Sequence, residues 1–493
     1  MSYRAGRARA YSALVVAVLA AGCATPRPAK LDPAAPVASR HVEAQRQIAV
    51  AAPEDHAVRQ AAYGEASPPL PARPVPLESS AEFGTLSAAD PLDLAVYVHE
   101  VLTRNRSLQA MTSAWRAAAE KYPQAVALDD PMFTAMTAPS SWSSDDVNAA
   151  YLLGGSQKIP WWGKRSLRGQ VARAEANAAS MDVADARLAL TQAAHLAYFD
   201  YYLVHRQLEL TEANLRSLDE FQVTARRQYE ANLVMQQDVL QAEVELAEGE
   251  RRRIELERMR RTSIARLNTL VHRPPDTPVP PPPSSLVVEG TPAPPELLRQ
   301  VAQQQRPDLA SMRAKIQAEN ASVALAYKEF YPDFEVMGRY DRFWQPTSTQ
   351  GDLQGQFGVN MNVPIYLEKR RAAAREAMYK LRRQRAEYEQ RIDDVNQEVE
   401  SAYAQVVEMQ AIVELYANRT LPAAERNVTS ARNDYVANRG DFLRLVSAQR
   451  QSLMLQEKYQ EAVAGYLSRR AELERAVGVP LPMELRAESV LTD

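Results

Sequence analysis

The residue types that could do chemistry are sparse in this sequence, and their spacing is not that of a catalytic or metal site. The 493 residues include six histidines and one cysteine. His195 and His205 are ten residues apart on one expected helix, which is not the spacing of metal ligands. The sequence contains no phosphate-binding loop, nucleophile elbow or Cys–His pair. We therefore predict a protein that is not an enzyme and has no catalytic residue, cofactor or resident metal.

The single cysteine, Cys23, follows a segment typical of a bacterial lipoprotein signal. Three arginines within residues 4–9 precede an apolar run, residues 12–21, that is too short to span a bilayer. The run ends in Leu-Ala-Ala-Gly-Cys, which resembles the lipoprotein cleavage box and makes residues 1–22 the signal peptide. We expect Cys23 to be acylated, with palmitate among its chains, and Ala24 after it favours the outer membrane. The alternative is an ordinary buried cysteine.

Composition divides the rest of the chain. The net charge of -3 gives no reason to expect a nucleic-acid partner. Proline-rich stretches indicate a tether over 23–89 and a linker over 274–295. They leave two repeats, 90–273 and 296–480, and a tail over 481–493.

Each repeat contains a pair of strands, a very long helix, a tight break and a second helix. The expected helices are 164–229 and 235–271 in the first repeat, and 369–437 and 441–477 in the second. At about 1.5 Å rise per residue each longer helix would be about 100 Å long, too long for a compact domain. Apolar residues in the second repeat step by four and three, which predicts an antiparallel coiled-coil seam: Val395, Val399, Ala402, Val406, Met409 and Val413.

The four expected strands alternate between apolar and polar residues. Two lie within 131–160, and the others are 331–345 and 354–366. Such strands are typical of a transmembrane barrel, although a half-buried soluble sheet is the alternative. Four strands cannot close a barrel, and no open sheet edge survives in lipid. The barrel must therefore be shared, with eight strands from two copies or twelve from three.

The two helix breaks have similar sequences. Each places Asn three residues after Tyr and then Asp-x-Leu at the start of the return helix: Tyr229, Asn232 and Asp238 in the first, Tyr435, Asn438 and Asp441 in the second. Asn tolerates the left-handed conformation that often reverses a helix, and Asp can cap the next helix.

At these motifs the sequence resembles the TolC-like family of bacterial outer-membrane efflux proteins over residues 90–480. Further matches are Arg306-Pro-Asp-Leu309 at the start of the second repeat, Tyr331-Pro-Asp-Phe334 before the strands, and Ile159–Lys164 and Val363–Lys369 after them. The resemblance implies a homotrimer with a twelve-stranded barrel and a long helical barrel in the periplasm.

The resemblance also implies partners and site residues. Beyond outer-membrane lipid, the partners would be a periplasmic adaptor protein and an inner-membrane pump, which we expect to be of the resistance-nodulation-division type. The tips that meet the adaptor would include Asn232, Leu233, Asn438 and Gly440. The aperture would be lined by Asp441, with Arg439, Arg444 and Asp238 near it. Arg439 could pair with Asp441 on a neighbouring helix, and the alternative is that Asp441 is only a helix cap.

We therefore expect an outer-membrane exit duct of a three-part efflux system, lipid-anchored and extending into the periplasm. Ile159–Lys164 looks closer to the metal-cation members of the family than to the drug members, so we expect heavy-metal cations as cargo. The alternatives are a drug or organic-compound duct of the same family, or a coiled-coil spacer lipoprotein without a pore. Trp161 and Trp162 would be interfacial anchors or packing residues at the barrel–helix junction.

Overall fold

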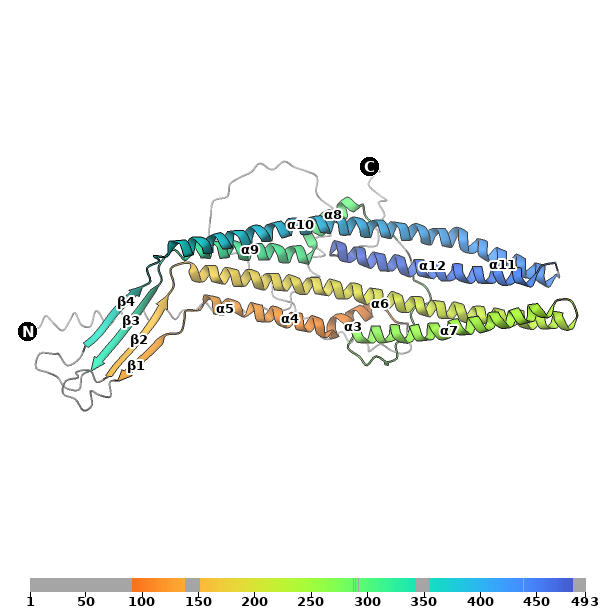
Figure 1. The fold of residues 1–493 in the computed structure, drawn as a ribbon, viewed down its shortest axis with the longest axis horizontal. Coiled ribbons are helices and arrows are strands. Elements are labelled where there is room, and N and C mark those ends of the chain that lie inside the picture. The colour runs from red at the N-terminus through yellow and green to blue at the C-terminus, as the bar shows by residue number, and fades with distance from the viewer. Residues whose placement is uncertain are drawn as a thin grey trace, which may run out of the picture. The chain divides into compact units, whose positions relative to one another are not determined.

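The computed structural model describes residues 91–137, 151–286, 288, 290, 292–342, 354–437 and 439–481 (Figure 1). Cys23, the expected signal peptide and tether, and Asn438 lie outside them, as does the tail beyond 481. The described chain divides into two compact units. The sheet unit comprises the described parts of 116–176 and 318–379. The hairpin unit comprises the described parts of 83–115, 177–317 and 380–493.

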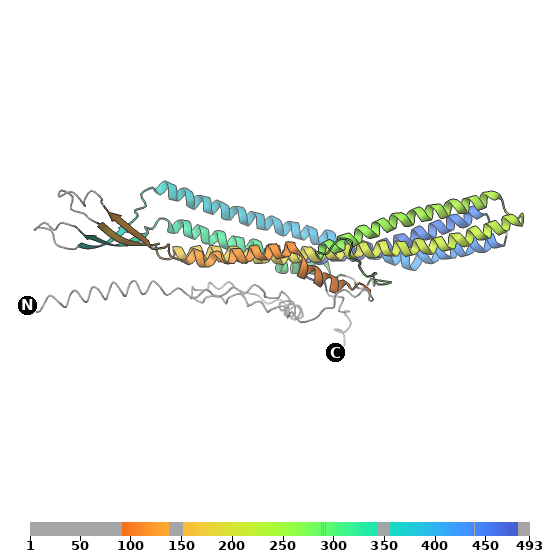
Figure 2. The ribbon, with the colours of Figure 1, turned by 90° about the horizontal axis from the view of Figure 1, so that it is seen from below.

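Ten α-helices can be followed in the described ranges (Figures 1 and 2). In the first repeat they are α3 (Leu94–Arg104), α4 (Arg106–Ala119), α5 (Lys121–Val126), α6 (Lys164–Glu230) and α7 (Gln236–Leu270). In the second repeat they are α8 (Pro295–Gln305), α9 (Pro307–Lys328), α10 (Leu367–Leu415), α11 (Leu421–Val436) and α12 (Phe442–Val477). None of the helices in the described ranges is both long and apolar enough to cross a bilayer.

Two helical segments are interrupted. The helical segment at the start of the first repeat consists of α3, α4 and α5, and Asn105 separates the first two by accepting the Ser107 backbone N–H at 3.0 Å. The second, expected to run unbroken over 369–437, contains a π-helical segment, Tyr416–Thr420. Pro422 explains it, because proline has no N–H for the helical ladder. The Thr420 hydroxyl instead donates to the Leu415 carbonyl at 3.3 Å.

The four strands form one antiparallel sheet in the order β1-β2-β3-β4 (Figure 1). They are β1 (Met132–Thr137), β2 (Tyr151–Ile159), β3 (Phe334–Arg342) and β4 (Gln354–Met361). The described sheet leaves the outer edges of β1 and β4 unpaired. The two repeats meet at its centre, where β2 pairs with β3 and Ile159 lies opposite Phe334.

The register gives the sheet one largely apolar face and one more polar face, although the second also carries Met132, Met136, Leu152 and Met337. The apolar face carries Phe133, Ala135, Leu153, Ile159, Phe334, Val336, Phe357, Val359 and Met361. The polar face includes Ser156, Lys158, Glu335, Gln356 and Asn360. The Glu335 carboxylate accepts from the Ser156 hydroxyl at 2.8 Å and from the Asn360 amide at 3.4 Å. Most of the large apolar side chains are exposed within one chain, so this face is uncovered.

The expected coiled-coil seam is confirmed by burial. Val395, Val399, Val406 and Val413 lie in the core of the hairpin unit together with α8 and α12, and Ala402 and Met409 pack against them. Buried tyrosines also hold the proline-rich linker. The Tyr201 hydroxyl donates to the Pro280 carbonyl at 3.1 Å, and the Tyr466 hydroxyl donates to the Gly290 carbonyl at 2.9 Å.

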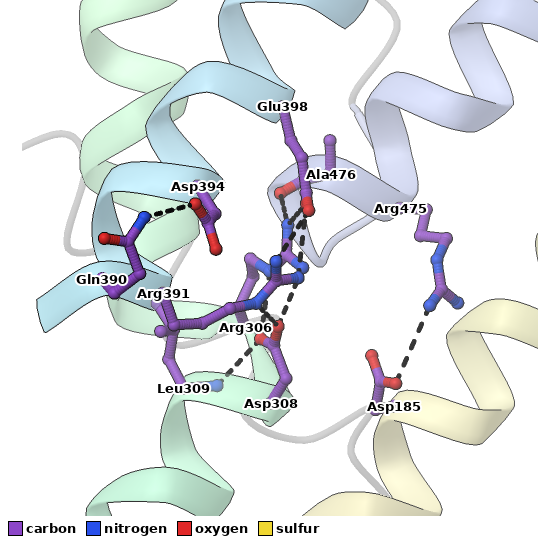
Figure 3. Close-up of polar contacts among 10 residues, drawn as sticks. All are labelled: Asp185, Arg306, Asp308, Leu309, Gln390, Arg391, Asp394, Glu398, Arg475 and Ala476. Atoms are coloured by element: carbon purple, nitrogen blue, oxygen red, sulfur yellow. Dashed lines mark hydrogen bonds and ion pairs between the residues drawn. The ribbon is translucent and has the colours of Figure 1, made fainter. Parts of the chain in front are cut away.

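A buried ion network joins α9, α10 and α12 within the hairpin unit (Figure 3). Arg306 is only 4% exposed and donates to Asp308 through two nitrogens, at 3.0 and 2.8 Å. It also donates to Glu398 at 2.6 Å and to the Ala476 carbonyl, near the end of α12, at 3.0 Å. Arg391 completes the network by contacting both acids at 2.9 and 2.8 Å. The buried Arg306 therefore has partners for its charge, and the other three charged residues are at least partly exposed.

The network perturbs Asp308. Burial alone would raise the pKa of this carboxyl, but hydrogen bonds and charge from Arg306 and Arg391 outweigh burial and hold the pKa below its ordinary value. A lowered pKa stabilises the folded state above the ordinary Asp value, and this stability is lost as the pH falls through the folded pKa. The network therefore contributes fully at neutral pH.

We predict that Arg306→Met destabilises the protein by about 1.5–3 kcal/mol, because it removes the charge-assisted hydrogen bonds that the buried guanidinium donates to Asp308 and Glu398. Arg299→Met is the matched control, since Arg299 pairs with the exposed Glu400 at the surface and its loss should cost about 0–1 kcal/mol. Thermal unfolding of the two purified variants measures the difference. Equal unfolding temperatures would show that the Arg306 network does not stabilise the fold.

Candidate functional site at the helix-hairpin tips

The first tip is the turn between α6 and α7. Asn232 has φ 59, the left-handed conformation expected for it. This turn brings the Leu233 N–H to the Gln228 carbonyl at 2.9 Å. Leu233 and Met235 are exposed apolar side chains at the tip. Met235, not Asp238, is the residue before α7, and Asp238 lies in the first helical turn, where its carboxylate still faces the positive end of the helix.

The second tip is the turn between α11 and α12. Asp441 is the N-cap of α12, and its carboxylate accepts the Leu443 N–H at 3.4 Å. Gly440 packs against the end of α11, where an added Cβ would lie 3.0 Å from the Cβ of Asp434. The small residue therefore permits the close approach. The structure confirms that Asp441 caps α12. Its expected place at an aperture remains a prediction.

The two tips meet at a cluster formed by Asp238, Asp441 and Tyr435. The Tyr435 ring lies on Phe442, with 5.4 Å between centroids, and its hydroxyl is buried without a hydrogen-bond partner in the described chain. Burial, together with the charges of the two carboxylates, raises the pKa of Tyr435 to about 12. Burial and the charge of Asp441 raise the pKa of Asp238. The first and second tips are thus electrostatically coupled within one chain.

The sequence did not predict that Tyr435 is buried. Its motif counterpart Tyr229 is 42% exposed, whereas Tyr435 is 3% exposed. The repeated Tyr-x-x-Asn motif identified both residues but could not distinguish them. The difference arises because Tyr435 packs in an apolar cluster with Leu218, Phe221, Ala225, Val239, Phe442 and Leu445, which come from both hairpins.

A charge pair holds the hairpins together farther from the tips. Glu245 of α7 is buried and receives hydrogen bonds from Arg450 of α12 and from Gln241. Arg439 and Arg444, the two expected aperture cations, are exposed and form no ion pair with other described residues. The expected pairing of Arg439 with Asp441 on a neighbouring helix is therefore not made within one chain and stays a prediction.

The described residues contain no group of three or more His, Cys, Asp or Glu side chains placed to hold a metal ion. The tip cluster has two carboxylates and a phenol, but no pairing of a nucleophile with a base. The geometry provides an apolar contact between two helix hairpins, with two like charges at its end, of which Asp238 is partly buried and Asp441 is exposed. Such an arrangement can hold two elements together more or less tightly; it supplies no groups for bond making.

The chain belongs to the outer membrane efflux protein family, because the model of that family matches residues 97–271 and 298–479, more than half of the chain. The two matched stretches correspond to the two repeats. Proteins of this family are outer-membrane efflux channels with a periplasmic extension and not enzymes, which identifies the class of this protein. Among curated proteins, no sequence matches it significantly.

Solved structures of outer-membrane channels share the fold. CusC is 17% identical, with a TM-score of 0.68 over 78% of this chain and 92% of that chain. VceC of Vibrio cholerae is 19% identical, with a TM-score of 0.66 over 78% and 96%. The open state of MtrE of Neisseria gonorrhoeae is 18% identical, with a TM-score of 0.64 over 79% and 90%. The expected fold class, mainly helical with a small antiparallel sheet, is confirmed.

We predict that acidification tightens the tip contact. A carboxyl whose folded pKa is raised stabilises the folded state below its ordinary pKa, and this stability is lost as the pH rises through the folded value. Protons should therefore strengthen the Asp238 contact as the pH falls from 7 toward the ordinary Asp pKa of about 4. Asp238→Asn should protect the tip amides at pH 7 and remove this pH dependence.

Hydrogen exchange of the amides of residues 435–446, corrected for the intrinsic effect of pH, measures the change. Glu230→Gln is the matched control, because Glu230 ends α6 and is exposed. It should leave the pH dependence intact. The same pH dependence in wild type and Asp238→Asn would contradict the assignment.

Proposed function

We propose that three copies of this chain form the outer-membrane duct of an efflux system and share one barrel. The observation that supports this most directly is the sheet: four strands with both outer edges open and one apolar face uncovered. A membrane can cover the apolar face, but lipid offers no hydrogen bonds to open edges. Neighbouring copies supply them. Twelve strands, rather than eight, follow from the resemblance to TolC-like proteins.

The hairpin tips are proposed as the periplasmic end of the duct. In this proposal the exposed apolar residues Leu233 and Met235 contact a periplasmic adaptor, together with Asn232, Asn438 and Gly440. Asp441 lines the aperture, with Asp238, Arg439 and Arg444 around it. The tip cluster supports this assignment, because packing between the two hairpins there would set how far the second tip can move. Energy comes from an inner-membrane pump of the resistance-nodulation-division type.

The anchor and the cargo complete the proposal. Acylation of Cys23 would add a lipid anchor to the barrel. Heavy-metal cations are proposed as cargo on the likeness of Ile159–Lys164 to metal-cation efflux proteins. In the structure Trp161 and Lys164 of this motif pack at the strand–helix junction, so the motif would report membership in the metal group and not contact the cargo.

The duct and its gate are tested by conductance in planar bilayers. The wild-type protein should insert and conduct weakly, and Asp441→Lys should raise the conductance because it places repulsive charge among Arg439 and Arg444. Asp441→Asn separates charge from capping, since Asn caps helices as well as Asp. A raised conductance in both variants indicates an aperture charge. A raised conductance in Asp441→Lys alone indicates only a cap, and protein that never conducts contradicts the duct.

The cargo is tested by growth of a strain that lacks the gene. Loss of the duct should lower resistance to heavy-metal cations and leave resistance to organic compounds unchanged, and the intact gene should restore it. The converse pattern would replace the metal cargo with the drug alternative. A strain with Cys23→Ser, analysed for labelled palmitate, tests the anchor: only the wild-type protein should carry the label.

A further inference from the structure

The strand pair β1–β2 and the strand pair β3–β4 have equivalent pairing, residue by residue. Met132 lies opposite Ser156 in the first pair of strands, and Glu335 lies opposite Asn360 in the second. Shifts of 203 residues for β1 onto β3 and of 204 for β2 onto β4 map the first pairing onto the second, although the pairings alone fix only the total of the two shifts. The arginine contacts support the shift of 203, because Arg165 donates to the Val126 carbonyl at 2.8 Å and Arg370 donates to the Glu329 carbonyl at 2.7 Å. The two arginines themselves are 205 residues apart, one more than the shift of 204 between β2 and β4, since one residue is added between β4 and Arg370.

The junction that follows β2 is covered by the start of β3. Trp161 stacks on Tyr331 and on Phe334, at centroid distances of 5.2 and 5.7 Å. Lys164 is 1% exposed and reaches Asp333 at 2.9 Å. The Asp333 carboxylate also accepts the Trp161 N–H at 2.8 Å. One aromatic residue and one lysine thus fasten the first repeat to the next strand of the sheet.

The corresponding junction after β4 lacks such a cover. Tyr366 takes the place of the aromatic residue and is 72% exposed, and its neighbour Ile365 is also exposed. Lys369 takes the place of Lys164, since Arg370 and Arg165 are equivalent. Lys369 is exposed and has no ion-pair partner among the described residues.

Residues equivalent to those that cover the first junction lie before β1, at the other edge of the sheet. The shift of 203 that maps β1 onto β3 makes Asp130 the counterpart of Asp333, and Pro131 the counterpart of Phe334. Asp130 is exposed, and no described side chain pairs with it. The segment after β4 thus carries a lysine that is unpaired among the described residues, Lys369, and an exposed aromatic ring, Tyr366. The segment before β1 carries a carboxylate, Asp130, and an apolar residue, Pro131, in the positions that pair with the lysine and the aromatic ring at the β2–β3 junction.

We propose that β4 of one copy pairs antiparallel with β1 of the next, with Met361 opposite Phe133 and with Lys369 bound to Asp130. The register follows from the observed pairing of Ile159 with Phe334. The shift of 204 carries Ile159 of β2 onto β4, and the shift of 203 carries Phe334 of β3 back onto β1. Tyr366 then packs on Pro131 as Trp161 packs on Phe334. This inference rests on the proposed shared barrel, and it adds the subunit interface and its register.

The faces of the strands are consistent with this register. In this register Met361, Val359 and Phe357 lie opposite Phe133, Ala135 and Thr137. All six belong to the same face of the sheet in the single chain. A slip of one residue would place Met361 and Phe357 opposite Met132 and Met136, which belong to the other face of the sheet, so the two faces would not continue across the interface. This agreement follows from the observed strand pairings, and a slip of two residues would keep the same faces together.

Cysteine cross-linking tests the register. Residues directly opposite on antiparallel strands have Cα atoms about 4.5–5.5 Å apart, within the range of a disulfide. In one chain β1 and β4 are three strand spacings apart, about 14 Å, so an intrachain bond cannot form. Met361→Cys with Phe133→Cys should give disulfide-linked trimers of the full-length protein on non-reducing gels. Met361→Cys with Ala135→Cys, displaced by two residues, should give far less, and each single variant should give none.

The outcomes separate this inference from the proposed function. Cross-linking through the displaced pair, or no cross-linking in a protein that light scattering shows to be trimeric, overturns the register and leaves the shared barrel standing. A protein that light scattering shows to be monomeric in detergent removes both.

A charge exchange tests the ion pair. Lys369→Asp and Asp130→Lys should each lower the temperature at which the oligomer dissociates, because each places like charges together, and the double variant should restore it. Glu368→Lys, one residue before Lys369, is the control and should not be rescued by Asp130→Lys. A double variant no more stable than the single ones would contradict the pairing of Lys369 with Asp130.

Discussion

Backbone N–H and C=O groups along the outer edges of β1 and β4 have no partner in the described sheet, and hydrocarbon cannot supply one. The sheet also exposes a row of apolar side chains that water would not favour. A single chain can meet one of these demands in a membrane but not both. The proposed shared barrel is the arrangement that removes the edges and covers the apolar face at once.

The internal repeat supplies a general plan, and the second repeat departs from it in specific places. Asn105 donates to the Leu270 carbonyl near the end of α7, whereas Arg306 donates to the Ala476 carbonyl near the end of α12 and also binds two carboxylates. The long helix of the first repeat is continuous, whereas that of the second contains the π-helical segment before Pro422. The second hairpin is thus held more firmly at its ion network and is irregular between that network and its tip.

These departures fit the proposed division of roles between the hairpins. The ion network fixes α9, α10 and α12 to one another. Beyond Val413 the long helix of the second repeat buries no described side chain until Tyr435, so it is weakly packed around the π-helical segment. In the proposed duct this allows the second tip to move relative to the first while the network stays intact.

Regular patterns could be read from the sequence, and long-range contacts could not. The heptad of valines and the alternation in β3 and β4 identified helices and strands, because both follow from the periodicity of side-chain burial. The match to the expected long helix α6 was close for the same reason. The π-helical segment was missed because Pro422 lies inside a long helical pattern, and whether such a proline ends, kinks or only disturbs a helix depends on tertiary packing that a single sequence does not show.

The candidate site was predicted in part. Asn232, Asp238 and Asp441 were recognised from the repeated break motifs, which are local. The burial of Tyr435 was not, since it depends on residues of α6 and α7 about 200 positions away. Lys164 was read as part of a motif, but its pairing with Asp333 joins residues 169 apart. Asn438 and Cys23 lie outside the described residues, and their roles remain predictions.

The most direct measurement is a density map of the detergent-solubilised particle at a resolution that separates strands. The account predicts three copies around one closed ring of twelve strands, with β1 of each copy beside β4 of its neighbour. A particle with one copy and an open four-stranded sheet, or with the edges of β1 and β4 covered by another segment of the same chain, would contradict it.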